Sequence, residues 1–503
     1  MTSPHNSPVT EQTWTPRLWG TLIVLCTALF LDALDVSMVG VALPSIGADL
    51  GLSTSSLQWI VSGYILGYGG LLLLGGRAAD LLGRRRVFLI ALGVFAGASL
   101  LGGVVESGEL LIATRFIKGL SAAFTAPAGL SIITTTFPEG SMRNRALALY
   151  TTCGATGYSM GLVFSGLLTE FSWRWTMLLP APIALIGVIA GLKLIPKSPR
   201  PEGRRHYDLP GAVTVTAAML TLVFTVVEAP EAGWASARTL VGFALAAVLI
   251  AVFVAVELRA KAPLIRLAVL RSSSQVQVNV GAATFMGAYI GFQFIVTLYL
   301  QQLLGWSALE TALAFLPAGA LVALSSTKVG TVIDKFGTSR MIVLGFAFHV
   351  IGYALFLQVD LSPTYAAVIL PSMLLLGAGF AVAFPSLNIQ ATNGVKDDEQ
   401  GMVAGMLNTS VQVGGAVFLA IVTAVVTAGG TEAGRTPQEV LDSYKPGLVT
   451  VTGIAALGLV VTALGLRAAR RRPGRSVLVA SSADLNTTAD EKTAAEEKVS
   501  VRD

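Results

Sequence analysis

The residues with the clearest chemical potential are two carboxylates inside a long apolar stretch. Asp32 and Asp35 lie in the segment LDALDVSMVGVALP. A charge at the centre of a bilayer costs about 2.5–3.5 kcal/mol on insertion scales. Two acids in such a stretch are therefore tolerable only if they face a wet cavity, are protonated, or have cationic partners.

A later apolar stretch supplies two candidate partners, Arg115 and Lys118. These cations are three positions apart, as the two acids are, and residues with this spacing share one face of a helix. We expect the four side chains to form a buried ion cluster in which Asp35 carries the proton. Asp32 is the second choice as carrier and serves mainly to neutralise Lys118. A Lys118 that is not neutralised would instead favour an anionic substrate, and a static ion network that only fixes helix packing is the alternative to proton coupling.

The composition predicts a membrane around this cluster. The chain has 503 residues, of which 53% are hydrophobic and 13% are charged, whereas soluble domains have about 25% charged residues. The net charge of +5 is modest and follows from basic loops, so we expect no nucleic-acid partner. Two cysteines in apolar segments and three scattered histidines predict neither a disulfide framework nor a metal site. No nucleophile–base set indicates an enzyme.

Fourteen apolar stretches are long enough to cross a bilayer as helices, which need about 20 residues each. They lie near residues 18–42, 55–75, 87–105, 110–135, 146–168, 174–195, 209–228, 237–257, 277–300, 308–330, 341–358, 364–386, 402–428 and 448–468. The polar residues before the first stretch lack the pattern of a removable signal peptide. The polar residues after about 472 predict a disordered tail.

Basic residues alternate between the loops. They are concentrated after the even-numbered spans two, four, six, eight, ten and fourteen, beginning with Arg84, Arg85 and Arg86. The loops on the other side are nearly free of them, or carry acids that balance them. Because basic loops stay in the cytoplasm, we expect a multi-pass plasma-membrane protein with both termini cytoplasmic.

An internal repeat divides the chain into two halves. GRAADLLGRRR (76–86) and GTVIDKFGTSR (330–340) share glycine, aspartate, glycine and arginine in register, and each follows an even-numbered span. Glycine permits the tight turn, and the charges form a latch that closes in one conformation and opens in the other. Topology anchoring alone is the alternative. The predicted latch residues are Gly76, Asp80, Gly83, Arg84, Arg86, Asp334 and Arg340.

These motifs resemble those of the major facilitator superfamily, and more closely its fourteen-span drug:proton antiporter family. The loop motif at 76–86 matches the superfamily signature, and LDVSMVGVALP resembles the family's first-span motif, with Ser37 for Thr and Gly40 for Asn. LIATRFIKGLSAA (111–123) resembles the fourth-span motif with its buried arginine at Arg115, although Lys118 replaces a glutamine. Further similar segments are GYSMGLVFSG (157–166), WRWTMLLPAP (173–182), 299–317 and 401–416.

The fifth-span segment resembles the antiporter motif of that family. Gly161 and Gly166 match it, whereas Leu162 and Ser165 replace a proline and a glycine. We expect Gly157, Gly161 and Gly166 to give this helix flexibility and to permit close helix packing.

The resemblance implies an all-α membrane fold with two six-helix bundles and two extra helices between them. The expected divisions are a cytoplasmic segment (1–16), a first bundle (17–196), two inserted spans with linkers (197–272), a second bundle (273–472) and a tail (473–503). The implied activity is proton-coupled export of a small, largely apolar drug or antibiotic by a bacterial protein. The proton motive force drives it without a cofactor, and the protein works as a monomer in the lipid bilayer.

Ligand sites in such folds lie near the middle of the membrane between the two halves. The expected cavity residues are aromatic and amide side chains, which suit planar and weakly polar compounds: Tyr64, Tyr68, Tyr289, Phe292, Gln293, Phe384, Asn388, Asn408 and Gln412. Packing between helices is the alternative role for each of them, and we expect His349 to be a packed or interfacial histidine rather than a ligand. A proton-coupled symporter or facilitator for a metabolite is the alternative activity on the same fold, and a purely structural membrane protein is a further one.

Overall fold

The computed structural model describes residues 14–138, 141–197, 208–260, 272–393, 395, 400–428 and 436–470, and these residues contain no strand. The first half contains α1 (Pro16–Leu50), α2 (Thr54–Leu82), α3 (Arg84–Val104), α4 (Gly108–Thr136), α5 (Ser141–Thr169), α6 (Arg174–Leu178) and α7 (Pro180–Leu194). Next come α8 (Leu209–Ala232) and α9 (Ala237–Arg259). The second half contains α10 (Ser273–Leu298), η2 (Tyr299–Leu303), α11 (Ala308–Phe336), α12 (Thr338–Phe356), η3 (Tyr365–Ile369), α13 (Leu370–Thr392), α14 (Gln400–Thr427) and α15 (Pro437–Arg470).

Fourteen helical segments correspond to the fourteen predicted spans, because α6 and α7 form one segment and the π-helices η2 and η3 extend α10 and α13. Thirteen of them, within the described residues, are long and apolar enough to cross a membrane. The exception is α5, which carries Arg143 and Arg145 in its first two turns and contains threonines and glycines among its apolar residues. With 29 residues it is nevertheless long enough, and it packs between α1 and α11 while part of its surface stays exposed.

The two copies of the sequence repeat fold into equivalent turns. Gly83 is the one residue between α2 and α3, and Gly337 is the one residue between α11 and α12. Their φ angles are 92° and 83°, in a region that glycine adopts without the steric penalty of other residues. The glycine at each of these places is thus required by the sharp reversal of the chain.

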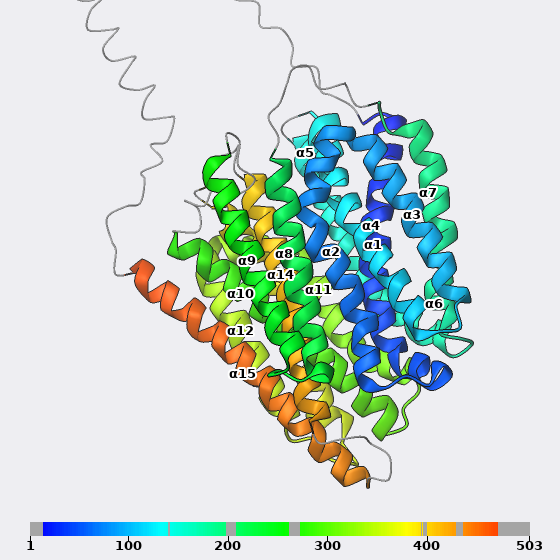
Figure 1. Cartoon of the computed structure of the whole chain (residues 1–503), viewed down its shortest axis with the longest axis vertical. Helices are drawn as coiled ribbons and strands as arrows, with labels where there is room; N and C mark the ends of the chain where they lie inside the picture. Colours follow the sequence, from blue (N-terminus) through cyan, green and yellow to red (C-terminus); the bar gives the residue numbers. More distant parts are fainter. Residues whose placement is uncertain are drawn as a thin grey trace, which may run out of the picture.

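Two helical bundles lie side by side in Figure 1, and the inserted pair covers the seam between them. Helices α1–α7 form the N-terminal bundle and α10–α15 the C-terminal bundle, which meet through α2 against α14 and α5 against α11. Helix α8 packs on α9 and contacts both α2 and α14. The predicted fold class, two six-helix bundles with two extra helices, is confirmed.

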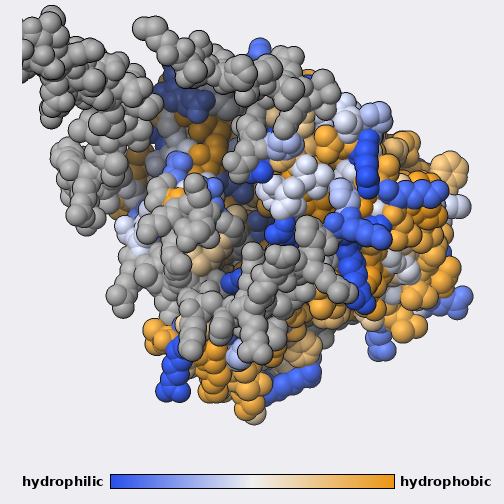
Figure 2. All heavy atoms as spheres, turned by 90° about the horizontal axis from the view of Figure 1, so that it is seen from above, coloured by the Kyte–Doolittle hydropathy of each residue, from blue (hydrophilic) through white to orange (hydrophobic). Residues whose placement is uncertain are grey.

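We call the end of the molecule with Gly51 the Gly51 end, and the end with Gly83 and Gly337 the Gly83 end. Figure 2 views the Gly83 end and shows hydrophilic side chains on this face with hydrophobic ones toward its rim. The apolar rim is what a lipid-facing belt requires.

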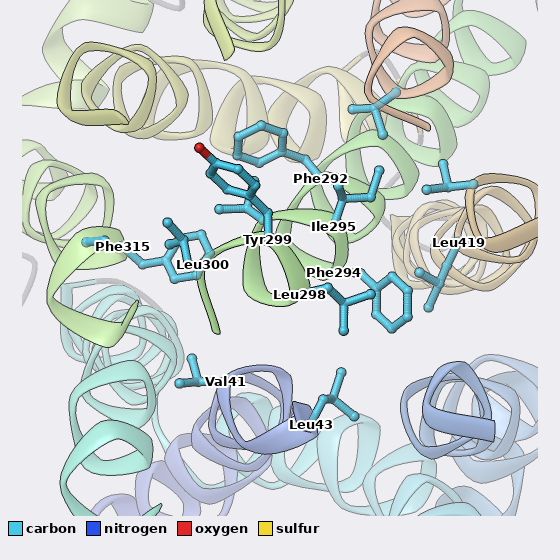
Figure 3. Close-up of a cluster of buried hydrophobic side chains, with 14 of the residues drawn as sticks. Val41, Leu43, Phe292, Phe294, Ile295, Leu298, Tyr299, Leu300, Phe315 and Leu419 are labelled. Carbon is cyan, nitrogen blue, oxygen red and sulfur yellow. The ribbon is translucent and has the colours of Figure 1, made fainter. Parts of the chain in front are cut away.

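At the Gly51 end, a hydrophobic cluster joins the two halves. It contains Val41 and Leu43 of α1 together with Phe294 and Leu298 of α10, and Figure 3 shows the side chains of α1 directed toward those of α10 and η2. The Gln301 amide also donates a hydrogen bond of 2.8 Å to the Val41 carbonyl across the halves. The Gly51 end is therefore closed in this conformation.

Candidate functional site

An ion cluster is buried between α1 and α4 in the N-terminal bundle. The carboxylate of Asp35 accepts hydrogen bonds from both Arg115 and Lys118, one on each oxygen. The side chains of Asp35 and Lys118 are completely inaccessible, and that of Arg115 is 2% exposed. Arg115 is also fixed by its Nε, which donates a 3.1 Å hydrogen bond to the carbonyl of Ile60 in α2. The structure thus brings together three of the four predicted charges as one triad.

The fourth charge, Asp32, has a different environment. Its side chain is 7% exposed, and its carboxylate accepts a 3.1 Å hydrogen bond from the hydroxyl of Thr125. No ion pair to Asp32 is found among the described residues, although Lys118 and Asp35 act on it electrostatically. The expected pairing of Asp32 with Lys118 is therefore absent here, because Lys118 bonds to Asp35 instead.

Aromatic rings complete the enclosure of the cations. The ring of Tyr64 lies 4.7 Å from the Arg115 guanidinium carbon, and the ring of Phe95 lies 4.9 Å from the Lys118 nitrogen. Such contacts stabilise a desolvated cation. Tyr64 is 1% exposed and belongs to the ion cluster. Its neighbour Tyr68 is only half-buried, with its ring 6.0 Å from that of Tyr64.

Glycines let α5 approach both halves. A β-carbon at Gly157 would collide with the backbone of Phe30, and one at Gly161 with the backbone of Leu34. At Gly166 a β-carbon would come within 2.7 Å of Ala312 in α11. The three predicted glycines are thus sites of close helix packing, and their role in flexibility stays a prediction.

A hydrogen-bonded contact joins the halves in the interior. The hydroxyl of Tyr158 in α5 donates a 2.7 Å hydrogen bond to the side-chain oxygen of Gln293 in α10. The amide nitrogen of Gln293 lies 3.3 Å from the position that a β-carbon would take at Gly40 of α1. Tyr289 lies beside them, with its ring 6.3 Å from that of Tyr158. Sequence reasoning missed Tyr158, although it lies in the antiporter-like segment.

The remaining predicted cavity residues are divided between packing and exposed positions. Phe292 is 1% exposed and packs against the rings of Tyr353 and Phe356, so it does not line a cavity in this conformation. Gln412 packs under Gly69, where α14 crosses α2. Phe384 is half-buried and stacks on Phe380. Asn388 and Asn408 are exposed, and the amide of each donates a hydrogen bond to a carbonyl of its own helix.

The predicted latch lies at the Gly83 end, and its pairing is not observed in the second copy. Asp334 and Arg340 are exposed and form no ion pair with other described residues. In the first copy Gly76 is half-buried, Arg86 is exposed and Arg84 has an interaction within the structure. The side chain of Asp80 lies outside the described residues. The latch therefore stays a prediction.

Two helical bundles with charged residues buried inside membrane-length helices are typical of a membrane transporter. The Major Facilitator Superfamily model matches residues 25–419. Because this is more than half of the chain, the protein belongs to the Major Facilitator Superfamily. It is a multi-pass membrane protein of that family.

The relatives belong to the drug-efflux branch of the superfamily. The chain is 34% identical to the puromycin resistance protein pur8 of Streptomyces alboniger, over 89% of this chain and 90% of that protein. It is 36% identical to the cephamycin export protein CmcT of Amycolatopsis lactamdurans, over 92% and 95% respectively. Among solved structures, the POT family transporter PepTSo aligns with a TM-score of 0.67 at 16% identity, covering 92% of this chain and 99% of that one. The structural likeness concerns the fold.

Proposed function

We propose that this protein exports a small, largely apolar organic compound of the antibiotic type across the plasma membrane in exchange for protons. The observation that carries this proposal is that α1 contains an acid outside the ion-paired triad, Asp32. Asp35 is neutralised by Arg115 and Lys118, whereas Asp32 has, among the described residues, only the Thr125 hydroxyl as a hydrogen-bond partner. Export itself is supported by relatives whose names describe antibiotic resistance or export.

The charge balance of the cluster explains how a proton would be coupled. Arg115 and Lys118 carry two positive charges, and Asp35 carries one negative charge. An ionised Asp32 brings the sum to zero, and a protonated Asp32 leaves it at +1. A net charge in the membrane interior is costly. Loss of the proton from Asp32 would therefore favour a conformation in which the cluster is buried, and binding of the proton would favour one in which water reaches the cluster.

This arrangement favours Asp32 over Asp35 as the proton carrier. Protonation of Asp35 would break the ion pairs that it forms with Arg115 and Lys118, which costs several kcal/mol. Protonation of Asp32 breaks no ion pair, and its hydrogen bond from Thr125 can persist on the carbonyl oxygen. The expectation from the sequence motif, that Asp35 carries the proton, is therefore replaced in our proposal.

The free energy released by one proton is large enough to drive drug export. One proton that moves inward across 100 mV releases about 2.3 kcal/mol. Since 1.36 kcal/mol corresponds to tenfold, a single proton would support a drug gradient of about 50-fold. We place both termini and the Gly83 end in the cytoplasm, as the basic loops indicate, so the closed Gly51 end faces outward.

Drug susceptibility in an efflux-deficient bacterium tests the proposal. Wild type, Asp32→Asn and Asp35→Asn would be compared against puromycin, lincomycin, a cephamycin and tetracenomycin C. We expect wild type to raise the inhibitory concentration of at least one compound and both variants to lose that protection. If equally expressed wild type protected against none of them, the export proposal would be rejected for these compounds.

Flux in proteoliposomes separates antiport from the alternative of symport. With a pH gradient that is acidic inside the vesicles, an antiporter accumulates drug against its own gradient, whereas a symporter expels it. Collapse of the pH gradient by a protonophore is the control. Drug movement in the same direction as the protons would favour the symporter.

A further inference from the structure

A buried histidine in the C-terminal bundle has no role in the ion cluster. His349 lies near the middle of α12 and is 1% exposed. Its Nδ1 is 3.0 Å from the carbonyl of Gly345, so Nδ1 carries the hydrogen and donates it. Its Nε2 is then a bare acceptor, and it has no hydrogen-bond partner among the described residues. An unpaired buried polar atom costs about 1–3 kcal/mol.

The helices are shaped around this imidazole. A β-carbon at Gly379 of α13 would collide with Nδ1, so the absence of a side chain there makes the space for the ring. The ring of Phe285 in α10 packs against it with a centroid separation of 4.4 Å. Tyr353 lies 5.5 Å away, also by ring centroids. A leucine would fill this space without leaving an unpaired acceptor.

The described side chains that face His349 carry no charge. Helix α10 contributes Phe285 and Tyr289, and α13 contributes Gly379 next to Phe380. The titratable groups among these neighbours are the two tyrosine hydroxyls of Tyr289 and Tyr353. Helices α10 and α13 contain no Asp, Glu, Lys or Arg, and the one such residue of α12 is Arg340. Helices α11 and α15 also touch α12. The charged residues of α11 are all exposed, and those of α15 lie before Pro446 or after Leu466.

A short chain of contacts links this histidine to the interface of the halves. The ring of Tyr289 is 6.4 Å from the imidazole on one side and 6.3 Å from the ring of Tyr158 of α5 on the other. Tyr158 in turn bonds to Gln293. Tyr158 belongs to the N-terminal half, whereas Tyr289 and Gln293 belong to the C-terminal half, so a separation of the halves would break these contacts.

We propose that His349 is a second proton-binding site, built into the C-terminal bundle. In the conformation with a closed Gly51 end the imidazole is neutral, because it is buried without a counter-ion. When the Gly51 end opens, Nε2 takes a proton from water, and the faces of the neighbouring rings stabilise the imidazolium. When the Gly51 end closes again, the imidazolium releases this proton to water on the Gly83 side, and the imidazole becomes neutral. This inference rests on the proposed proton coupling and adds a second proton to each cycle.

The sign of the pH effect follows from where the proton is bound. Since the open Gly51 conformation binds protons and the closed one releases them, low pH favours opening. Each linked proton changes the ratio of the two conformations by up to about tenfold per pH unit. With His349 and Asp32 both titrating, the wild-type ratio would change by up to about 100-fold per unit.

Spin-label distances across the Gly51 end measure this ratio. Labels would be placed on Phe171→Cys and Ser362→Cys, which are exposed loop positions on the two halves at this end, in a variant without Cys26 and Cys153. The labelled full-length protein in lipid nanodiscs would be followed between pH 8 and pH 5 without a drug, with His349→Gln as the test variant and Asp32→Asn as its matched comparison.

The four results are distinguishable. We expect a steep pH dependence for the labelled wild-type protein, about tenfold per unit for either single substitution, and none for the two combined. If His349→Gln matched the wild type, the second site would be refuted while proton coupling stands. The second site would likewise be refuted if Asp32→Asn alone abolished the response. A wild type that ignores pH would refute the proton-coupling proposal and this inference together.

A second measurement leaves position 349 unchanged. His5 and His206 are the only other histidines, so His5→Asn and His206→Asn leave His349 as the single imidazole. Nitrogen-15 spectra of this protein should show the Nδ1–H tautomer at pH 8 and growing imidazolium signals toward pH 5. A neutral imidazole across the whole range would overturn the inference even if His349→Gln misfolded.

Discussion

Replacing Asp35 by asparagine tests whether the buried triad is a tightly coupled unit. The substitution preserves the size of the side chain and removes the one carboxylate that Arg115 and Lys118 share. Both cations would remain buried, and among the residues that the structure describes only Arg115 keeps another hydrogen bond, to the carbonyl of Ile60. Stranding a buried partner in this way costs about 3–5 kcal/mol.

The expected loss is large enough to measure by thermal unfolding. For domains of 150–250 residues, 1 kcal/mol corresponds to about 2–4 °C, so Asp35→Asn should lower the melting temperature by roughly 6–20 °C. The assay is unfolding of the purified protein in detergent, followed by intrinsic fluorescence. Adding Lys118→Met should restore part of the loss, because it removes one of the two stranded charges.

The same helix offers a matched control. Asp49 of α1 pairs with Arg174 at 3.1 Å, but the two side chains are 51% and 29% exposed. Exposed pairs contribute about 0–1 kcal/mol, so Asp49→Asn should lower the melting temperature by at most about 4 °C. Equal shifts for Asp35→Asn and Asp49→Asn would refute the reasoning, since burial would then not decide the strength of the pair.

Further predictions concern coupling and packing. Asp32→Asn should leave the melting temperature within about 2 °C of wild type, because the Thr125 hydrogen bond can persist, while drug uptake into vesicles depends less steeply on the pH gradient than in wild type; an unchanged dependence would contradict this. Gly161→Val should prevent both folding and transport because a β-carbon there collides with α1. Gly93→Ala should fold and transport as wild type does, because a β-carbon at Gly93 meets no atom within 4 Å. Gly40→Asn should reduce export by displacing Gln293, whose amide is 3.3 Å from the new β-carbon; unchanged export rates would show that the contact is dispensable.

Much of the architecture follows from local sequence. Apolar stretches of spanning length predict the helices, and the repeated Gly-Asp-Gly-Arg pattern predicts two equivalent turns, which Gly83 and Gly337 form with positive φ angles. These features depend on the chain near each residue, through hydrophobicity and the conformational freedom of glycine. The weak apolar character of α5 is the exception, since its place in the bundle is fixed by its contacts with α1 and α11.

Which residues meet in the interior was decided by the tertiary structure. Spacing puts Asp32 and Asp35 on one face of α1, and Arg115 and Lys118 on one face of α4, but it does not choose among the possible pairs. The depth and rotation of the two helices give both cations to Asp35 and leave Asp32 to Thr125. A helix turns by about 100° per residue, so sequence alone could not tell that Gln293 faces the other half while its neighbour Phe292 packs inside its own bundle.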